Sequence, residues 1–282
     1  MCISPITKRN HEYRFENGDS ATKQVPCGKC HECLALRRNS WSFRLHHQMM
    51  NSYTSCFMTL TYGIHQDEGW GNNPPLSPNG LYTLEKSDLK GFFKRLRYYN
   101  NEEFKYYAVG EYGTISKRPH YHVIMFNMDK SLITNSLRLS KNIWKAGNVD
   151  IARCNIRTIN YVVGYVMKGQ FKPEDQFDDR LPEFALQSKG LGSSFLTDSM
   201  HEYLYDRMQT WVEHPSGFKI PLPRYYRDKI FTTEEKAELL DIRNQLNDYQ
   251  LGEEISDKDK LVSTKYRIEK HERMQARQRL KI

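Results

Sequence analysis

The chain has 282 residues, of which 38% are hydrophobic and 27% charged, with a formal net charge of +8 and a pI near 9.0. This length allows one large domain, and the positive charge favours nucleic acid as a partner, with a membrane surface as the second possibility. No stretch approaches the roughly 18 apolar residues that a membrane-spanning helix needs, and the first residues lack the apolar segment of a signal peptide. We therefore expect a cytosolic protein without a membrane partner.

The N-terminal stretch 1–33 has no strand or helix pattern, but it contains CGKCHEC at residues 27–33. Its C-x2-C-x2-C spacing brings three thiolates close together, and a cysteine at the extreme N-terminus is the preferred fourth ligand, with His31 as the weaker candidate. The candidate set is Cys2, Cys27, Cys30 and Cys33. Four thiolates suit a structural, tetrahedral Zn²⁺, while an iron–sulfur centre or free thiols are the alternatives.

The first half of the chain predicts two helices and three strands. Apolar residues at helical spacing predict a helix over 34–50, and the β-forming residues of 55–62 predict a strand. A second helix is expected over 87–100, with Ser87 as its N-cap. A glycine turn between two apolar runs predicts a β-hairpin over 104–127.

The second half has a weaker pattern towards its end. We expect helices over 131–144 and 159–169, with a strand within 147–158 between them. Beyond residue 170 the helical pattern returns over 198–214 and again from Thr232 onward, where charged residues are dense. These patterns predict three parts, a cysteine-containing segment with the first helix (1–50), a central core (51–200) and a helical, charged C-terminal region (201–282).

Two histidines stand one residue apart in the expected hairpin, in RPHYH at residues 118–122. On a strand, residues i and i+2 point to the same face about 6.5–7 Å apart, so His120 and His122 can share one divalent ion. The preceding strand ends with Glu111, which can lie opposite and add a carboxylate ligand. The alternatives are ordinary surface histidines and a glutamate that belongs only to the turn.

The helix expected over 159–169 carries two phenols and an ammonium group on one face. Tyr161, Tyr165 and Lys168 stand at positions i, i+4 and i+7. A phenol, with a pKa near 10, is a poor nucleophile at neutral pH unless a metal ion polarises the group that it attacks. The alternative is an amphipathic helix with half-buried tyrosines.

Three sequence motifs together resemble the HUH endonucleases, which start rolling-circle replication by nicking single-stranded DNA. The motifs are FMTLTY at 57–62, RPHYHVIMF at 118–126 and the two-tyrosine form YVVGYVMK at 161–168. With the N-terminal cysteines, they look like the replication initiators of Microviridae phages of the gokushovirus type. The resemblance covers roughly residues 1–200 and does not extend to the C-terminal third.

This resemblance implies an α+β fold in which a central antiparallel sheet is flanked by helices. It implies Mg²⁺ or Mn²⁺ on Glu111, His120 and His122, nucleophiles at Tyr161 and Tyr165, and an accessory role for Lys168. The implied reaction joins a tyrosine to the 5′ phosphate of origin DNA, starts rolling-circle replication of a small single-stranded DNA phage, and rejoins the strand at termination. The sequence leaves open which tyrosine acts first.

The partners implied are single-stranded origin DNA, a host DNA polymerase and a host helicase in the cytoplasm of the host cell, since no Walker-type GxxxxGK[ST] motif is present. Basic residues near the motifs are candidates for phosphate contacts, and exposed aromatic rings could stack on bases. The candidates are Arg37, Arg38, Lys117 and Arg118 for phosphate, and Trp70, Tyr98, Tyr99 and Trp144 for stacking. Two alternatives are a relaxase or transposase of the same chemistry and a non-catalytic zinc-dependent DNA-binding regulator.

Overall fold

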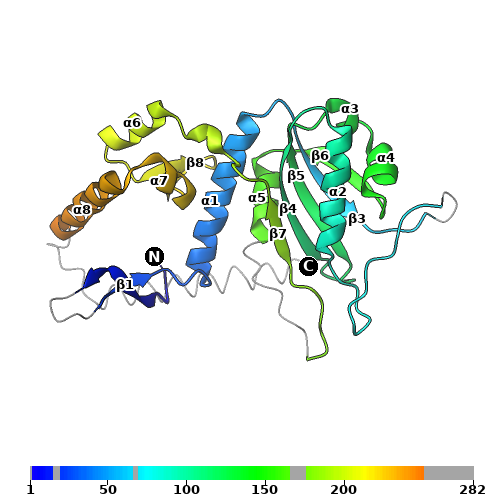
Figure 1. Cartoon of the computed structure of the whole chain (residues 1–282), viewed down its shortest axis with the longest axis horizontal. Coiled ribbons are helices and arrows are strands. Elements are labelled where there is room, and N and C mark those ends of the chain that lie inside the picture. Colours follow the sequence, from blue (N-terminus) through cyan, green and yellow to red (C-terminus); the bar gives the residue numbers. More distant parts are fainter. Residues whose placement is uncertain (1, 15–19, 66–68, 166–175, 251–282) are drawn as a thin grey trace. The chain divides into compact units, whose positions relative to one another are not determined.

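A computed structural model describes residues 2–14, 20–65, 69–165 and 176–250 of the chain. It divides into two compact units (Figure 1). The cysteine unit comprises Met1–Leu36, Asp198–Trp211 and Pro221–Ile282, and the sheet unit comprises Arg37–Thr197 and Val212–Ile220. The expected functional division at residues 50 and 200 stays a prediction.

Five antiparallel strands form the central sheet of the sheet unit, in the order β6-β3-β5-β4-β7. The strands are β3 Ser55–Thr61, β4 Lys105–Tyr112, β5 Pro119–Phe126, β6 Val149–Arg153 and β7 Phe184–Gln187. The expected strand after residue 54 and the expected hairpin are confirmed, whereas β7 lies in a stretch that showed no strand pattern. The histidine-bearing strand β5 is in the middle, and the expected α+β class is confirmed.

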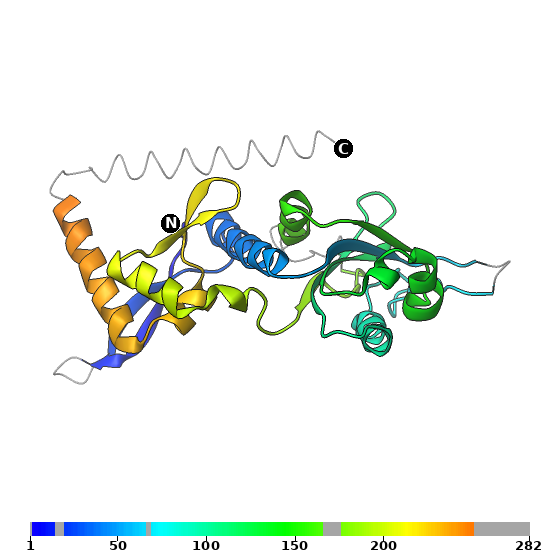
Figure 2. The same ribbon diagram turned by 90° about the horizontal axis from the view of Figure 1, so that it is seen from above.

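Helix α2 (Lys86–Tyr99) covers one face of this sheet (Figure 2). Its apolar stripe joins a core with the side chains of β3, β4 and β5 that point to this face. The helix begins after Glu85, whose carboxylate accepts a hydrogen bond from the Ser87 N–H, so the prediction of Ser87 as N-cap is wrong. Within the core, the buried Tyr121 hydroxyl donates to the Glu85 carbonyl at 2.9 Å, which fixes the start of α2 against β5.

The helix expected over 131–144 is broken into three pieces. These are α3 Lys130–Ile133, α4 Ser136–Arg138 and the π-helix η2 Leu139–Trp144. The break follows from Asn135, whose side chain accepts a hydrogen bond from the Arg138 N–H and starts a new helix instead of continuing the first. Trp144 is buried in the core and donates its indole N–H to the Thr61 carbonyl, so the prediction that it stacks on DNA bases is wrong.

The other face of the sheet packs against α5 (Ile156–Gly164) and against the sheet-unit part of α1 (His31–Met50). Figure 2 shows α5 on the side of the sheet opposite α2. Asn155 caps α5 through a capping box with Thr158, which satisfies backbone N–H groups at the start of the helix. The Ser42 hydroxyl of α1 donates to the Asn160 side chain at 2.5 Å, so α1 fixes α5 in place.

The cysteine unit contains a hairpin that the sequence pattern did not predict, β1 Ile6–Arg14 paired with β2 Ser20–Val25. Its described helices are α6 Asp198–Asp206, α7 Arg224–Ile230 and α8 Thr233–Gln250. The prediction of one helix over 198–214 is correct only in its first half, because β8 Trp211–His214 pairs with β9 Phe218–Pro221. Within the described part of the chain, none of the helices is long and apolar enough to cross a membrane.

A candidate metal and tyrosine site on the central strand

The three predicted metal ligands converge at one point on β4 and β5. The strand register places Glu111 directly opposite His120. The Glu111 Oε1 atom lies 2.6 Å from His120 Nε2 and 3.2 Å from His122 Nε2. One donor atom from each residue lies within 4.8 Å of the others, so the three side chains form a group that could hold a metal ion.

The outer nitrogen of each imidazole is oriented by a neighbour. His120 Nδ1 lies 3.3 Å from the Arg118 carbonyl, which can only accept, so Nδ1 carries the hydrogen. His122 Nδ1 lies 3.2 Å from the Thr59 hydroxyl on β3. This arrangement leaves Nε2 of His120 as the inward ring nitrogen, which is the tautomer that a metal-binding histidine requires.

The carboxylate of Glu111 is held in its ionised form, although the residue is only 5% exposed. Burial raises the pKa of Glu111, but the hydrogen bonds and positive charge of His120 and His122 outweigh it, and the net shift is downward. A bare imidazole nitrogen and a carboxylate oxygen are both acceptors, so a proton or a cation has to lie between His120 and Glu111. The chemistry of this donor set therefore fits a divalent cation.

The two predicted nucleophiles lie beside this group, on α5 and at its end. Tyr161 is 52% exposed, and its hydroxyl lies 3.4 Å from His122 Nε2. Tyr165 is only 9% exposed, and its ring stacks on His122 with centroids 5.5 Å apart. Burial, the hydrogen bond from Tyr161 and the charge of Glu111 raise the pKa of Tyr165. The two phenols therefore have different access to a substrate.

Lys168, the third predicted member of this helix face, lies outside the described residues, as does the expected helix end at Gly169.

Two side chains that sequence reasoning did not assign to the site hold His122 in place. Phe57 on β3 stacks on its ring with centroids 5.4 Å apart, and Thr59 contacts its Nδ1 as described. Thr59 stood in the first motif only as a structural strand residue. The signal that could have identified both residues is period-2 alternation, since residues 57 and 59 share a strand face, but the pairing of β3 with β5 is needed to place that face beside His122.

The candidate DNA-contacting residues differ in their surroundings. Lys117 and Arg118 are exposed in the turn just before His120, and Arg118 also donates to the Tyr62 carbonyl at 3.1 Å. Arg37 is exposed on α1, and Arg38 beside it donates to the Asn39 side chain. All four positions can present positive charge, and two of them border the metal-ligand group.

The aromatic candidates are less well placed. Tyr98 is 85% exposed, but it lies on α2, on the face of the sheet opposite the histidines. Trp70 stacks on His65 with ring centroids 3.8 Å apart, and Tyr99 packs against the core that α2 makes with the sheet.

The four predicted cysteine ligands are also brought together, in the cysteine unit. One sulfur atom from each of Cys2, Cys27, Cys30 and Cys33 lies within 4.8 Å of the others, and His31 is not part of the group. The structure therefore contains two separate groups of side chains that could each hold a metal ion.

Comparisons with known proteins agree with the resemblance seen in the motifs. Residues 55–170 match the family of the replication-associated protein ORF2. This match contains β3 to β6, the three candidate metal ligands and both tyrosines. No solved structure matches the chain.

Three phage proteins are similar over most of the chain. Replication-associated protein VP4 of Bdellovibrio phage phiMH2K is 28% identical over 86% of this chain and 78% of the relative. Replication-associated protein ORF2 of Spiroplasma virus 4 is 26% identical over 80% of this chain and 78% of the relative. Replication-associated protein ORF4 of Chlamydia phage 1 is 26% identical over 72% of this chain and 53% of the relative. With its ORF2-type domain at residues 55–170, the chain belongs to the replication-associated proteins of Microviridae-type phages.

Proposed function

We propose that the protein is a replication initiator that nicks single-stranded origin DNA through a tyrosine. The reaction leaves a 5′-phosphotyrosine link, starts rolling-circle replication of a small single-stranded DNA phage, and is reversed to rejoin the strand at termination. The observation that carries this proposal is the exposed Tyr161 phenol, 3.4 Å from His122 Nε2 and beside the group of Glu111, His120 and His122.

Glu111, His120 and His122 are the proposed ligands of Mg²⁺ or Mn²⁺. Their inward atoms face one another, and the buried Glu111 carboxylate supplies the negative charge that a hard cation requires. When bound, the cation would polarise the scissile phosphate and stabilise the charge that develops on it. Thr59 and the Arg118 carbonyl act as positioning groups, because they hold the outer nitrogens of the two rings.

Tyr161 is the proposed first nucleophile. Its exposure gives a phosphate access to the hydroxyl, whereas Tyr165 is buried, with a raised pKa, and stays protonated. Attack forms a bond between the Tyr161 oxygen and phosphorus while the bond from phosphorus to the 3′ oxygen breaks. The phenol proton passes to solvent, the departing 3′ oxygen takes up a proton, and the strand is left with a free 3′ hydroxyl that a polymerase can extend.

The second tyrosine has a purpose in such a cycle. At termination a new strand has to be cut while the first is still covalently held, so a second phenol within reach of the same phosphate site is required. Tyr165 contacts both Tyr161 and His122, with ring centroids 5.1 Å and 5.5 Å away. We assign Tyr165 to this second transfer.

The exposed positive charges extend the proposed substrate path. Lys117 and Arg118 border the histidines, and Arg37 and Arg38 lie on α1, so the backbone of single-stranded DNA can contact several phosphate-binding groups. A host helicase would unwind the duplex and a host polymerase would extend the free end, which places the protein in the host cytoplasm.

The test is a search for a covalent adduct on a pool of random single-stranded oligonucleotides labelled at the 3′ end. Because the tyrosine joins the 5′ phosphate of the downstream fragment, the label should migrate with the protein on a denaturing gel in the presence of Mn²⁺. The double variant Tyr161→Phe, Tyr165→Phe should give no adduct. The matched control is Tyr98→Phe, which removes an exposed tyrosine on the opposite face of the sheet and should leave the adduct unchanged.

The same experiment separates the alternatives. A DNA-binding regulator would retain the pool in a native gel and never form an adduct, which would overturn the proposal. A relaxase or transposase would also form the adduct, so the trapped sequence is then supplied within a circular template. Release of a closed unit-length circle supports an initiator, whereas joining only to a different DNA molecule contradicts it.

A further inference from the structure

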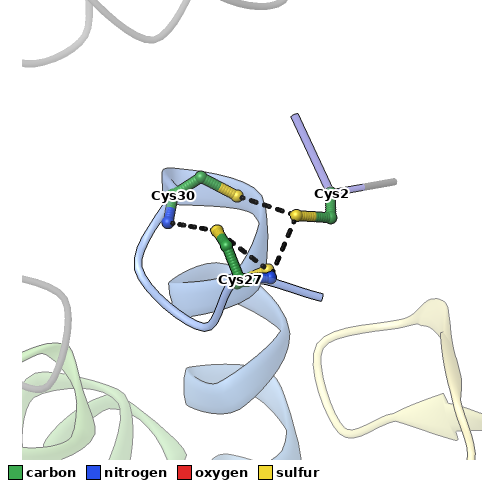
Figure 3. A group of neighbouring side chains, drawn as sticks. Cys2, Cys27 and Cys30 are labelled. Atoms are coloured by element: carbon green, nitrogen blue, oxygen red, sulfur yellow. Dashed lines mark hydrogen bonds between the residues drawn. The ribbon is translucent and has the colours of Figure 1, made fainter. Parts of the chain in front are cut away.

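The four cysteines of the cysteine unit have the spacing of a metal–thiolate centre. Cys2 Sγ lies 3.8 Å from Cys30 Sγ, and Cys27 Sγ lies 4.0 Å from Cys33 Sγ (Figure 3). A tetrahedron of sulfur ligands at about 2.3 Å from zinc has its sulfur atoms about 3.8 Å apart. The observed separations are far longer than the roughly 2.05 Å of a disulfide bond, and all four cysteines are free.

Backbone amides point at these sulfur atoms. The N–H of Cys27 donates to Cys2 Sγ at 3.3 Å, and the N–H groups of Lys29 and Cys30 donate to Cys27 Sγ at 3.5 Å and 3.2 Å. A neutral thiol is a weak acceptor, whereas a thiolate accepts readily, so several amides aimed at sulfur indicate that negative charge is stabilised there. This is an observation independent of the distances between the sulfur atoms.

The turn that carries Cys27 and Cys30 depends on a glycine between them. Gly28 has φ +74°, a left-handed conformation that other residues adopt only with strain, and it lets the chain fold back so that the next two amides reach Cys27 Sγ. Helix α1 then begins at His31 and places Cys33 within its first turn. Turn and helix together direct three of the four thiols to one point.

The fourth position belongs to Cys2 and not to His31. His31 Nε2 lies 3.5 Å from Glu32 Oε1 and is absent from the sulfur group. Cys2 reaches the group from the other side, since its Sγ is near both Cys30 Sγ and the Cys27 amide (Figure 3). The ligand set is therefore four sulfur atoms.

We propose that Cys2, Cys27, Cys30 and Cys33 bind one structural Zn²⁺, and that this ion closes the open end of the hairpin β1–β2. The hairpin begins with Ile6 paired to Val25, so one ligand precedes its first strand and the other three follow its second. On binding, the four thiols release their protons to solvent and become thiolates.

The hairpin needs such a closure. It is a two-stranded sheet of its own, and its register is irregular between Arg9 and Arg14. An isolated pair of strands is at best marginally stable in water. An ion bound at the open end adds its binding free energy to the folding of this segment.

The first test is the metal content of the full chain purified without chelators. We expect about one zinc per chain, and absorbance by bound iron or an absence of metal would overturn the proposal. Two histidines and a carboxylate can also bind zinc, so the measurement is repeated in His122→Ala. This variant should retain the zinc if the cysteines hold it, and loss of all zinc would contradict the proposal.

The second test uses Cys2→Ser, which removes one ligand from the N-terminal end without touching the sheet unit. The matched control is Cys154→Ser, a buried cysteine far from the group in sequence. Cys2→Ser should lose most of its zinc and expose the hairpin to protease, with cleavage between residues 6 and 25 at least about tenfold faster. Equal zinc content and equal cleavage in both variants would show that the group is four ordinary thiols.

Discussion

The two candidate metal sites of this chain are supported in opposite ways. Glu111 and His122 are buried on two paired strands with a packed core on either face of the sheet. The four cysteines are only half-buried and lie at the end of a two-stranded hairpin and in one turn. The sheet therefore holds its ligands in place before any ion arrives, whereas the cysteine group relies on the ion for much of its stability.

This difference teaches what a bound ion does in each place. Ligands fixed by a core can leave coordination positions open to a substrate, because the ion is not needed to hold the fold. Ligands fixed mainly by their own metal form a closed site with a structural role. The predictions that follow test that contrast.

The largest effect is expected for His122→Ala. It removes one of the three ligands of the proposed catalytic ion and the partner of the Tyr161 hydroxyl, so nicking should fall by about a thousandfold or more. Binding of single-stranded DNA should change little, because many basic residues contact phosphate. Rates are measured by single-turnover adduct formation and affinities by fluorescence anisotropy. Nicking that persists in the presence of a chelator would break the contrast, because the sheet site would then need no metal.

The two tyrosines sharpen the description of the sheet site. Tyr161→Phe should slow the first nick by about a hundredfold, since it removes the exposed phenol. Tyr165→Phe should keep the first nick within about threefold but fail to release closed circles. Mass spectrometry of the trapped adduct identifies the tyrosine that carries the nucleotide. An adduct found first on Tyr165 would show that exposure does not select the nucleophile.

Removal of metal from the wild-type protein tests the contrast directly. A strong chelator should increase amide hydrogen exchange in Ile6–Arg14 and Ser20–Val25 by about tenfold or more, since the proposed ion closes this hairpin. Exchange in β3, β4 and β5 should stay the same, because the core holds these strands without the ion. Mass spectrometry of peptides resolves the two regions. Equal changes in both regions, or none in the hairpin, would contradict the contrast.

The smallest effect is expected for Asn155→Ala, which removes the cap of α5. The side chain accepts hydrogen bonds from the N–H groups of Arg157 and Thr158, and its loss should lower the free energy of unfolding by about 1 kcal/mol. Urea denaturation measures this value, with Asn135→Ala, the cap of the short helix α4, as the comparison. If the core fixes Tyr161 as firmly as we infer, nicking should change less than threefold.

Sequence reasoning predicted the sheet site well, because two simple periodicities determine it. The spacing of His120 and His122 places them on one strand face, and the hairpin brings Glu111 opposite them. The pairing of β3 with β5, which brings Phe57 and Thr59 to His122, depends on contacts between residues distant in the chain. The difference in exposure between Tyr161 and Tyr165 depends on the packing of α5, which spacing alone does not give.

The errors in predicted elements have local causes. Helical spacing over residues 131–144 hid the capping side chain of Asn135, and helical spacing over 198–214 hid the alternation of Trp211, Val212 and Glu213 that marks β8. The hairpin β1–β2 escaped prediction because its residues are mostly polar and lack alternation. In the proposed account its stability comes from the cysteines on either side of it and not from a buried face.

The direct pairing of Glu111 with His120 has a consequence for how chains of this kind can vary in length. Successive side chains of a strand point to opposite faces, so a single insertion or deletion within β4 would turn Glu111 away from the histidines and towards Tyr121. The same change in the turn between Tyr112 and Pro119 would leave both strands in register. Variation in length can therefore accumulate in that turn, while the stretch from Lys105 to Glu111 is confined to substitution.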